Sequence, residues 1–230
     1  MRQSAAFALL CAACSSRPEV PIVNWHALGV AGNEFSISEF TFNRQIELLA
    51  REGFQSVALH DVVEHRLSGL PLPARPVVLT FDDGTEDALK RVLPVLKKRG
   101  MRGTFFIATG LLGKPGYLDW DGVRALSAAG MEIGSHSVSH ARLTEVSDEQ
   151  LREELVRSKQ ALEEHLGRTI EVFAYPYNAV RPGVRDAAAR AGYRAAVAGE
   201  VHGGADLLDL YRISVKSTMT LDDFRRQVQR

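Results

Sequence analysis

Two short motifs place acidic and imidazole side chains directly after apolar, strand-like runs. Asp82 and Asp83 follow the run Val77–Phe81, and His136 and His140 follow a second run. Two adjacent carboxylates repel each other unless they share a cation or a proton. Neutral imidazole is a common metal ligand, and a three-residue spacer lets two imidazoles converge on one ion. The motifs therefore predict a metal site, whereas a helix cap would explain only one of the two aspartates.

Two histidines and one aspartate leave a coordination position open, which is typical of a catalytic rather than a structural site. A divalent cation there would lower the pKa of its water to about 7 and polarise a carbonyl oxygen. One aspartate would bind the ion, and its neighbour would take a proton from the water. The pattern indicates metal-assisted hydrolysis with a general base, and it suits zinc, cobalt or nickel alike.

Two further candidates are less specific. The run Val172–Tyr175 leads into Pro176 and Tyr177, and the backbone N–H of Tyr177 can face a developing oxyanion. Packing at a barrel rim would explain this tyrosine equally well. His26 ends the first apolar run, and it fits either a functional role or a packed rim position. The histidines that fall on helical stretches are assigned no role, and they are His60, His65 and His165.

Strand-like runs alternate with amphipathic helical stretches along the whole chain. The predicted strands are Pro21–Trp25, Phe54–Leu59, Val77–Phe81, Thr104–Ile107, Met131–Ser135, Val172–Tyr175, Tyr193–Ala198 and Arg212–Val215. Ser36 with Glu39, and Ser147 with Gln150, have the spacing of helix-capping boxes. Repeated strand–helix units favour a single-domain α/β fold, a distorted (β/α) barrel of about seven or eight parallel strands. An open doubly wound sheet is the alternative. In either fold the carboxyl ends of the strands bring the motifs to one face.

The bulk composition is that of one ordinary globular domain. The chain has 230 residues, 45% hydrophobic residues and a formal net charge of zero. Nucleic-acid binding is disfavoured because a basic excess is absent. No glycine-rich fingerprint follows the first predicted strand, so a dinucleotide site has no support.

The first residues differ from the rest. Arg2 precedes the apolar run Ala5–Ala13, which is shorter than the ~20 residues of a membrane span and fits a secretory signal. The segment Leu10–Cys14 resembles a bacterial lipoprotein cleavage box, with Cys11 at an unusual position. We therefore expect a signal peptide over 1–14, a lipid on Cys14 that attaches the protein to a membrane, and export to the periplasm or cell envelope. A plain secretory signal is the alternative, and the catalytic domain is expected over 20–230.

The sequence resembles the polysaccharide deacetylase family, also called the NodB homology domain or carbohydrate esterase family four. The motifs that carry the resemblance are Thr80–Gly84, His136–His140 and Phe173–Tyr177. The resemblance extends from Pro21 to about Phe224. The opening run, Val20–His26, is similar to that of the branch that de-N-acetylates exported biofilm poly-N-acetylglucosamine.

The resemblance implies a role for each motif residue. Asp82 would be the general base, and Asp83, His136 and His140 would hold one divalent metal ion, with zinc the first expectation. Tyr177 would contribute an oxyanion contact through its backbone N–H. The expected substrate is an acetylated polysaccharide that contains N-acetylglucosamine.

Three departures from the family pattern stand out. Ala174 occupies the place of an arginine that orients the base, a loss that the biofilm branch shares. The family's aspartate–tryptophan motif has no clear equivalent. The last strand region, Tyr211–Lys216, lacks the histidine that protonates the leaving group. His26 and His202 are the candidates for that proton donor.

The sequence therefore predicts a hydrolase that removes N-acetyl groups. One alternative is an O-acetyl esterase acting on xylan or on peptidoglycan sugars, because an ester leaves without protonation more readily than an amide does. The other is a relative that binds polysaccharide without turnover, which the missing arginine and histidine would explain.

Overall fold

The computed structural model describes residues 20–29, 33–199 and 206–229. In this part of the chain nine strands form one parallel sheet, in the order β8-β7-β6-β5-β4-β3-β1-β9, with β2 beside β3. The strands are β1 (Ile22–Trp25), β2 (Gln55–Val57), β3 (Pro76–Phe81), β4 (Thr104–Ile107), β5 (Glu132–Ser135), β6 (Val172–Ala174), β7 (Ala195–Ala198), β8 (Leu210–Tyr211) and β9 (Ile213–Ser214).

The two ends of the strand order belong to one chain segment. β8 pairs with β7 and β9 pairs with β1, and Arg212 alone separates β8 from β9. The N–H of Arg212 donates to the Ala198 carbonyl at 3.0 Å, and the N–H of Val215 donates to the Asn24 carbonyl at 2.9 Å. This segment closes the sheet on itself. The predicted distorted barrel in a single domain is therefore confirmed, and the open-sheet alternative is wrong.

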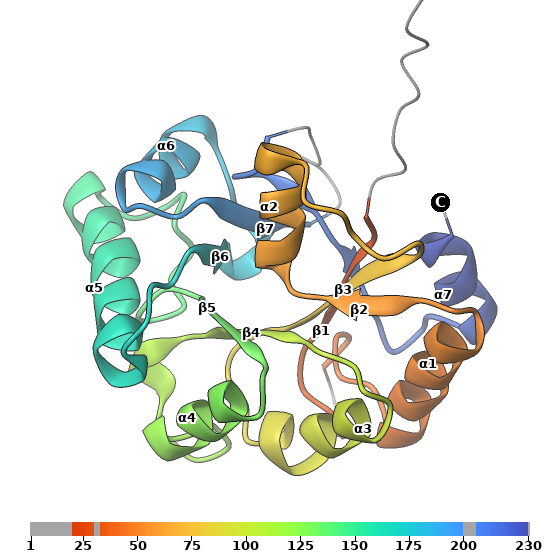
Figure 1. Cartoon of the computed structure of the whole chain (residues 1–230). Helices are drawn as coiled ribbons and strands as arrows, with labels where there is room; N and C mark the ends of the chain where they lie inside the picture. The colour runs from red at the N-terminus through yellow and green to blue at the C-terminus, as the bar shows by residue number, and fades with distance from the viewer. Residues whose placement is uncertain (1–19, 30–32, 200–205, 230) are drawn as a thin grey trace, which may run out of the picture.

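Seven α-helices surround or cover the barrel in the described residues (Figure 1). They are α1 (Glu39–Arg51), α2 (Leu59–Ser68), α3 (Leu93–Lys98), α4 (Trp120–Ala128), α5 (Asp148–Leu166), α6 (Pro182–Arg190) and α7 (Leu221–Val228). Six of them lie around the outside, whereas α2 lies over the middle of the sheet (Figure 1). The described helices include none with the length and apolar character that a membrane span requires.

Helix starts follow the sequence signals in part. Ser147 caps α5 as predicted, because its side chain accepts a hydrogen bond from the Gln150 N–H at 3.2 Å. The predicted cap of α1 was wrong by two positions. Ser38, not Ser36, has the extended backbone of a cap and accepts from the Thr41 N–H at 3.0 Å. After β3, a π-helical turn over Ala88–Val92 leads directly into α3.

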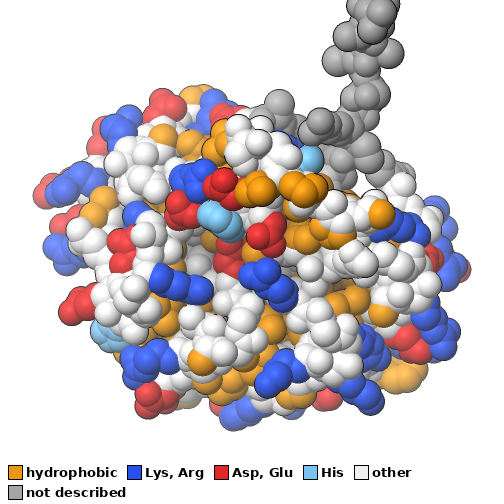
Figure 2. Space-filling model, viewed as in Figure 1, with side chains coloured by type: hydrophobic (Ala, Val, Ile, Leu, Met, Phe, Trp, Pro, Cys, Tyr) orange, Lys and Arg blue, Asp and Glu red, His pale blue; other side chains and the backbone are white. Residues whose placement is uncertain are grey.

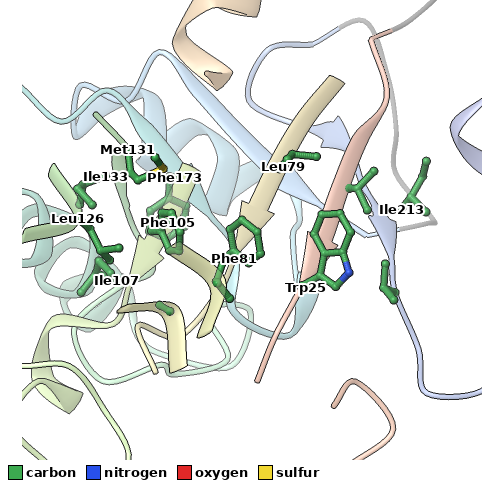
Figure 3. Packing of buried hydrophobic residues seen from close by; sticks show 14 of the residues in the cluster. Trp25, Leu79, Phe81, Phe105, Ile107, Leu126, Met131, Ile133, Phe173 and Ile213 are labelled. Atoms are coloured by element: carbon green, nitrogen blue, oxygen red, sulfur yellow. The ribbon is translucent and has the colours of Figure 1, made fainter. Parts of the chain in front are cut away.

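Alternation along the strands divides the apolar residues into an outer and an inner layer. Outward residues pack under the surrounding helices, where Phe81 stacks between Trp25 and Phe105 at ring distances of 5.5 and 4.7 Å (Figure 3). Inward residues such as Val78 and Phe106 fill the barrel and pack with α2. The barrel is full at this level, because a Cβ on Gly134 would lie 2.6 Å from the Phe106 ring.

The two ends of the barrel differ as a result. At the amino end of the strands, α2 closes the barrel with Leu59, Val62 and Val63. Viewed as in Figure 1, the surface around α2 carries acidic and basic side chains interspersed with apolar ones (Figure 2). At the carboxyl end none of the described helices covers the inward positions, which carry polar side chains such as Asn24, Asp82 and His136.

Candidate metal centre and active site

Three of the predicted ligands converge at the carboxyl end of β3 and β5. Asp83 Oδ1 lies 3.4 Å from His136 Nε2 and 3.3 Å from His140 Nε2. Both distances exceed an ordinary N–H···O hydrogen bond. They match the spacing of about 3.4 Å between ligands that sit about 2.1 Å from a tetrahedral zinc ion. The three donor atoms lie within 4.8 Å of one another, so the set fits one divalent cation.

The backbone fixes which nitrogen of His136 faces this point. His136 is buried, and its Nδ1 lies 2.8 Å from the Ala174 carbonyl oxygen. A carbonyl can only accept, so Nδ1 carries a proton and Nε2 is the nitrogen that faces Asp83 and can bind a cation there. Such a hydrogen bond orients the imidazole of a metal ligand. Ala174 occupies the position of the missing arginine. It contributes to the site through its main-chain carbonyl, which orients the His136 ring.

The loop that carries the second histidine is held by a glutamate that sequence reasoning missed. Glu154 on α5 is buried and accepts hydrogen bonds from the Val138 and Ser139 N–H groups, each at 2.8 Å. The side chain of Ser137 also accepts from the His140 N–H at 3.0 Å. A glutamate within a helix pattern gives no signal of this contact. The loop geometry therefore depends on α5.

Backbone strain is concentrated around the same centre. Among the described residues, the non-glycine positions with positive φ are Asp83, Ser137, His140, Tyr177 and Asn178. Their φ values run from 52° to 72°, in the left-handed region that non-glycine residues rarely adopt. Such conformations persist where the surrounding structure imposes them, and they cluster at functional sites.

The predicted base is held by a residue that sequence reasoning also missed. Arg212, between β8 and β9, donates from Nη1 to Asp82 Oδ1 at 2.8 Å, and both side chains are buried. Asn24 on β1 donates to the other oxygen, Oδ2, at 3.2 Å. Arg212 also donates from Nη2 to the Asn178 side chain at 3.1 Å. A guanidinium thus reaches the base from the closing segment instead of from position 174.

Charge sets the protonation of the two aspartates. Burial alone would raise the pKa of Asp82, but the Arg212 charge, with smaller effects of His136 and His26, lowers it below its ordinary value. Burial likewise opposes ionisation of Asp83, but its interactions with the His136 and His140 imidazoles, together with the charge of His26, hold its pKa well below the usual range. Burial would lower the pKa of His136, and the charges of Asp82 and Asp83 raise it instead. Both aspartates are therefore carboxylates at neutral pH.

Tyr177 and His26 stand on either side of these groups, in a cavity of about 300 Å³. The Tyr177 ring packs edge-on against His140 at 4.7 Å, and its turn uses the N–H groups of Asn178 and Ala179 for internal hydrogen bonds. The N–H of Tyr177 is not engaged by those bonds. The proposed oxyanion contact of Tyr177 stays a prediction.

His26 is half-buried at the end of β1, with Nε2 3.8 Å from Asp82 Oδ2. Burial lowers its pKa more than the nearby Asp82 raises it. His202, the other candidate proton donor, lies outside the described residues. The remaining described histidines have other neighbours: His60 pairs with Glu171 at 2.8 Å, His65 contacts the Leu70 carbonyl oxygen at 2.6 Å, and the His165 ring packs against Trp120 in a tilted arrangement with a centroid distance of 3.8 Å.

Three deacetylases of known sequence or structure are similar to this chain. The solved structure of Streptococcus pyogenes deacetylase PplD in complex with acetate has a TM-score of 0.84 and 25% identity, and the match covers 91% of this chain and 97% of PplD. The poly-beta-1,6-N-acetyl-D-glucosamine N-deacetylase of Staphylococcus aureus (strain MSSA476) is 24% identical over 157 residues, covering 62% of this chain and 54% of that protein. The peptidoglycan-N-acetylglucosamine deacetylase of Bacillus cereus is 28% identical over 111 residues, covering 48% of this chain and 39% of that protein.

The polysaccharide deacetylase pattern matches residues 69–196, which is more than half of the chain. The matched region runs from Gly69, at the end of α2, into β7 and includes both the aspartate and the histidine motifs. This chain therefore belongs to the polysaccharide deacetylase family, and it is a hydrolase of that family.

Proposed function

We propose that this protein is a metal-dependent hydrolase that removes N-acetyl groups from an N-acetylglucosamine-containing polysaccharide. The observation that carries the proposal is the convergence of Asp83, His136 and His140 beside a second carboxylate, Asp82, which is ion-paired with a buried arginine. The names of the S. aureus and B. cereus relatives, which both describe removal of N-acetyl groups from N-acetylglucosamine, support the choice of bond.

Asp83, His136 and His140 would hold the cation, with zinc first and cobalt or nickel as alternatives. A bound divalent cation would supply Lewis acidity, which acidifies water and polarises the acetyl carbonyl. Asp82 takes the proton of the attacking water. Its Oδ1 accepts the charge-assisted bond from Arg212 at 2.8 Å, whereas Oδ2 accepts only a longer bond from the neutral Asn24 amide at 3.2 Å, so Oδ2 is the oxygen more available to act as the base. Arg212 and Asn24 fix the direction of this carboxylate before substrate arrives.

The other pocket residues act on the amide as it breaks. The Tyr177 N–H donates to the carbonyl oxygen as negative charge develops on it. Because burial lowers the pKa of His26, its imidazole receives a proton during the reaction from Asp82, whose Oδ2 lies 3.8 Å from Nε2. His26 passes this proton to the leaving nitrogen, so that the C–N bond breaks to give acetate and a free amine. We assign the donor role to His26 because it lines the same cavity as Asp82.

O-acetyl esters on xylan or on peptidoglycan sugars are the second candidate substrates. The observation that favours them is the lack of a histidine in the described segment Asp206–Lys216, where the family resemblance implies a proton donor. An alkoxide leaves more readily than an amide nitrogen, so ester cleavage needs that proton less. A binding protein without turnover is less favoured, because Arg212 fills the place of the missing arginine.

Acetate release tests the proposal. Purified protein loaded with zinc should release acetate from a β-linked N-acetylglucosamine oligosaccharide, and removal of the metal by a chelator should abolish the release. The Asp82→Asn variant is the matched control, because it keeps the shape of the side chain but cannot act as the base. The proposal would be wrong if wild type and Asp82→Asn released acetate at the same rate. Faster release from an O-acetylated xylan oligosaccharide would favour the esterase.

We also propose that the protein is exported and attached to a membrane through a lipid on Cys14. The support is the sequence of residues 1–14, which lies outside the described residues. Expression of the full chain with a labelled fatty acid should label the wild type and leave Cys14→Ser unlabelled. Label on both proteins, or on neither, would contradict the lipid anchor.

A further inference from the structure

Arg142 stands at the rim of the catalytic cavity, two residues after the ligand His140. Its guanidinium lies 4.6 Å above the Tyr177 ring, which in turn packs against His140. Both rim side chains face solvent, with 44% of the Arg142 side chain and 55% of Tyr177 exposed. The stacking gives an otherwise flexible arginine a defined place beside the reacting centre.

Arg142 differs from the other charged groups of this cavity. Four charged side chains line it among the described residues: Asp82, Asp83, Arg142 and Arg212. Asp82 and Arg212 pair with each other, and Asp83 faces the two imidazoles. Arg142 has no carboxylate partner inside the cavity.

The carboxylate that pairs with Arg142 lies outside the cavity. Glu145 is three residues away in the chain, with Oε1 3.4 Å from Arg142 Nε and 72% of its side chain exposed. An exposed pair of this kind has little interaction energy. Among the described residues no carboxylate of the cavity pairs with the Nη groups of Arg142, so a substrate can reach them. A guanidinium prefers a carboxylate as partner, because two parallel hydrogen bonds can form.

We propose that Arg142 is a specificity-determining residue that selects an acetylated glycan carrying a carboxylate on a sugar next to the one that is deacetylated. This inference rests on the proposed function and names the substrate class of the same site. Neutral polymers of N-acetylglucosamine lack this carboxylate. Glycan strands in which alternate N-acetyl sugars bear a lactyl ether carboxylate have it, so they are the better substrates.

The test compares two substrates that differ only in charge. Such strands, freed of peptide, are compared with the same strands after their carboxylates have been amidated. Wild-type kcat/KM should be about tenfold higher on the acidic strands, as expected for one charge-assisted hydrogen bond. In Arg142→Gln this ratio should fall toward one. In Glu145→Gln, which removes the competing carboxylate, the ratio should rise.

Arg124→Gln is the matched control. Arg124 is also about half-exposed and also pairs with an acidic residue three positions away, but it lies on α4 and does not line the cavity. It removes the same charge from the protein, and it should keep the wild-type ratio. Arg142→Lys should give an intermediate ratio, because it keeps the charge without the planar fork.

The possible outcomes distinguish a failure of the Arg142 specificity from a failure of the proposed deacetylase function. A ratio in Arg142→Gln equal to that of wild type would overturn the role of Arg142, and so would an equal fall in Arg124→Gln. If wild type turns over both strands at the same rate, the proposed function stands and the specificity does not. If wild type releases no acetate from either strand or from neutral oligosaccharides, the proposed function itself fails.

Discussion

The two ends of the barrel each hold carboxylates, but they hold them in opposite ways. At the amino end, the Glu132 carboxylate accepts hydrogen bonds from the Leu59 and His60 N–H groups at 2.7 and 3.0 Å and from the Thr104 hydroxyl at 2.6 Å. These donors include the first free N–H groups of α2. At the carboxyl end, Asp83 Oδ1 is buried and faces only two imidazoles at longer range.

The pKa directions show the same contrast. Burial raises the pKa of Glu132, and its hydrogen-bond donors offset this only in part. The pKa values of Asp82 and Asp83 are lowered in spite of burial, because a guanidinium and imidazoles face them. Glu132, whose two oxygens accept three hydrogen bonds, holds an element in place. Asp83, whose buried Oδ1 accepts none, is available to bind a cation, and Asp82 is held beside it. One end of the barrel is therefore built for stability and the other for chemistry.

Loss of His136 should have the largest effect on activity. His136→Ala removes a ligand with its Nε2 lone pair, and we expect acetate release to fall at least about a thousandfold. Bound zinc, measured by elemental analysis, should fall in parallel. The control is His60→Ala, because His60 is an imidazole at the amino end, and it should keep both zinc and turnover. Retained zinc in His136→Ala would show that the cation binds elsewhere.

Replacement of Arg212 should come next. Arg212→Met leaves Asp82 buried without its cation, and we expect kcat to fall about a hundredfold, since the base loses its orientation. Burial then dominates, so the pKa of Asp82 should rise relative to wild type. The acid limb of the kcat/KM profile should therefore move to higher pH. Arg212→Lys should restore part of the rate, and an unshifted acid limb in Arg212→Met would contradict the pairing.

Removal of Glu132 should lower the stability of the protein and leave its activity nearly unchanged. Glu132→Ala leaves the first N–H groups of α2 without an acceptor, and we expect a loss of about 2 kcal/mol in the free energy of unfolding. Urea unfolding measures this loss. The kcat of the folded fraction should stay near wild type, because the active site lies at the other end of the barrel. Glu149→Ala, at an exposed glutamate on α5, should change neither quantity. A fall in kcat without a loss of stability would contradict the assignment of a stabilising role to the amino end of the barrel.

The smallest effect is expected at Thr104. Thr104→Val removes one of the donors to Glu132 and keeps the shape of the side chain, so we expect a loss of about 1 kcal/mol. The same unfolding experiment measures it. A loss larger than that of Glu132→Ala would mean that Thr104 acts through packing and not through Glu132.

Much of the fold could be predicted from local sequence. Apolar runs located eight of the nine described strands and missed the two-residue strand β8, and the motifs at two strand ends identified the residues that converge at the centre. Parallel strands end at one face, so the motifs needed no knowledge of the loops. The same logic could not separate Ser36 from Ser38 as a helix cap, because either hydroxyl has suitable spacing and only backbone conformation decides.

Arg212 and Asn24 were missed for a different reason. Asn24 lies in β1 and Arg212 lies between β8 and β9, and these strands pair with distant parts of the chain, so no local motif marks either residue. A signal was nevertheless present: Arg212 sits between Tyr211 and Ile213, and its alternation with Leu210 and Ser214 puts it on the inward side. An arginine facing a barrel interior must find a carboxylate. The strand pattern alone could not say which one.

The segment that closes the barrel, β8 to β9, also determines at which stage of folding the active site is complete. All three candidate ligands lie between residues 83 and 140, whereas the guanidinium that orients the base is 130 positions beyond Asp82. A truncated chain that stops before β8 would retain the ligand motifs. It would lack the arginine that orients Asp82 and the two strands that close the barrel. We therefore expect little turnover from incomplete chains, and full turnover only after the closing segment has paired with both β7 and β1.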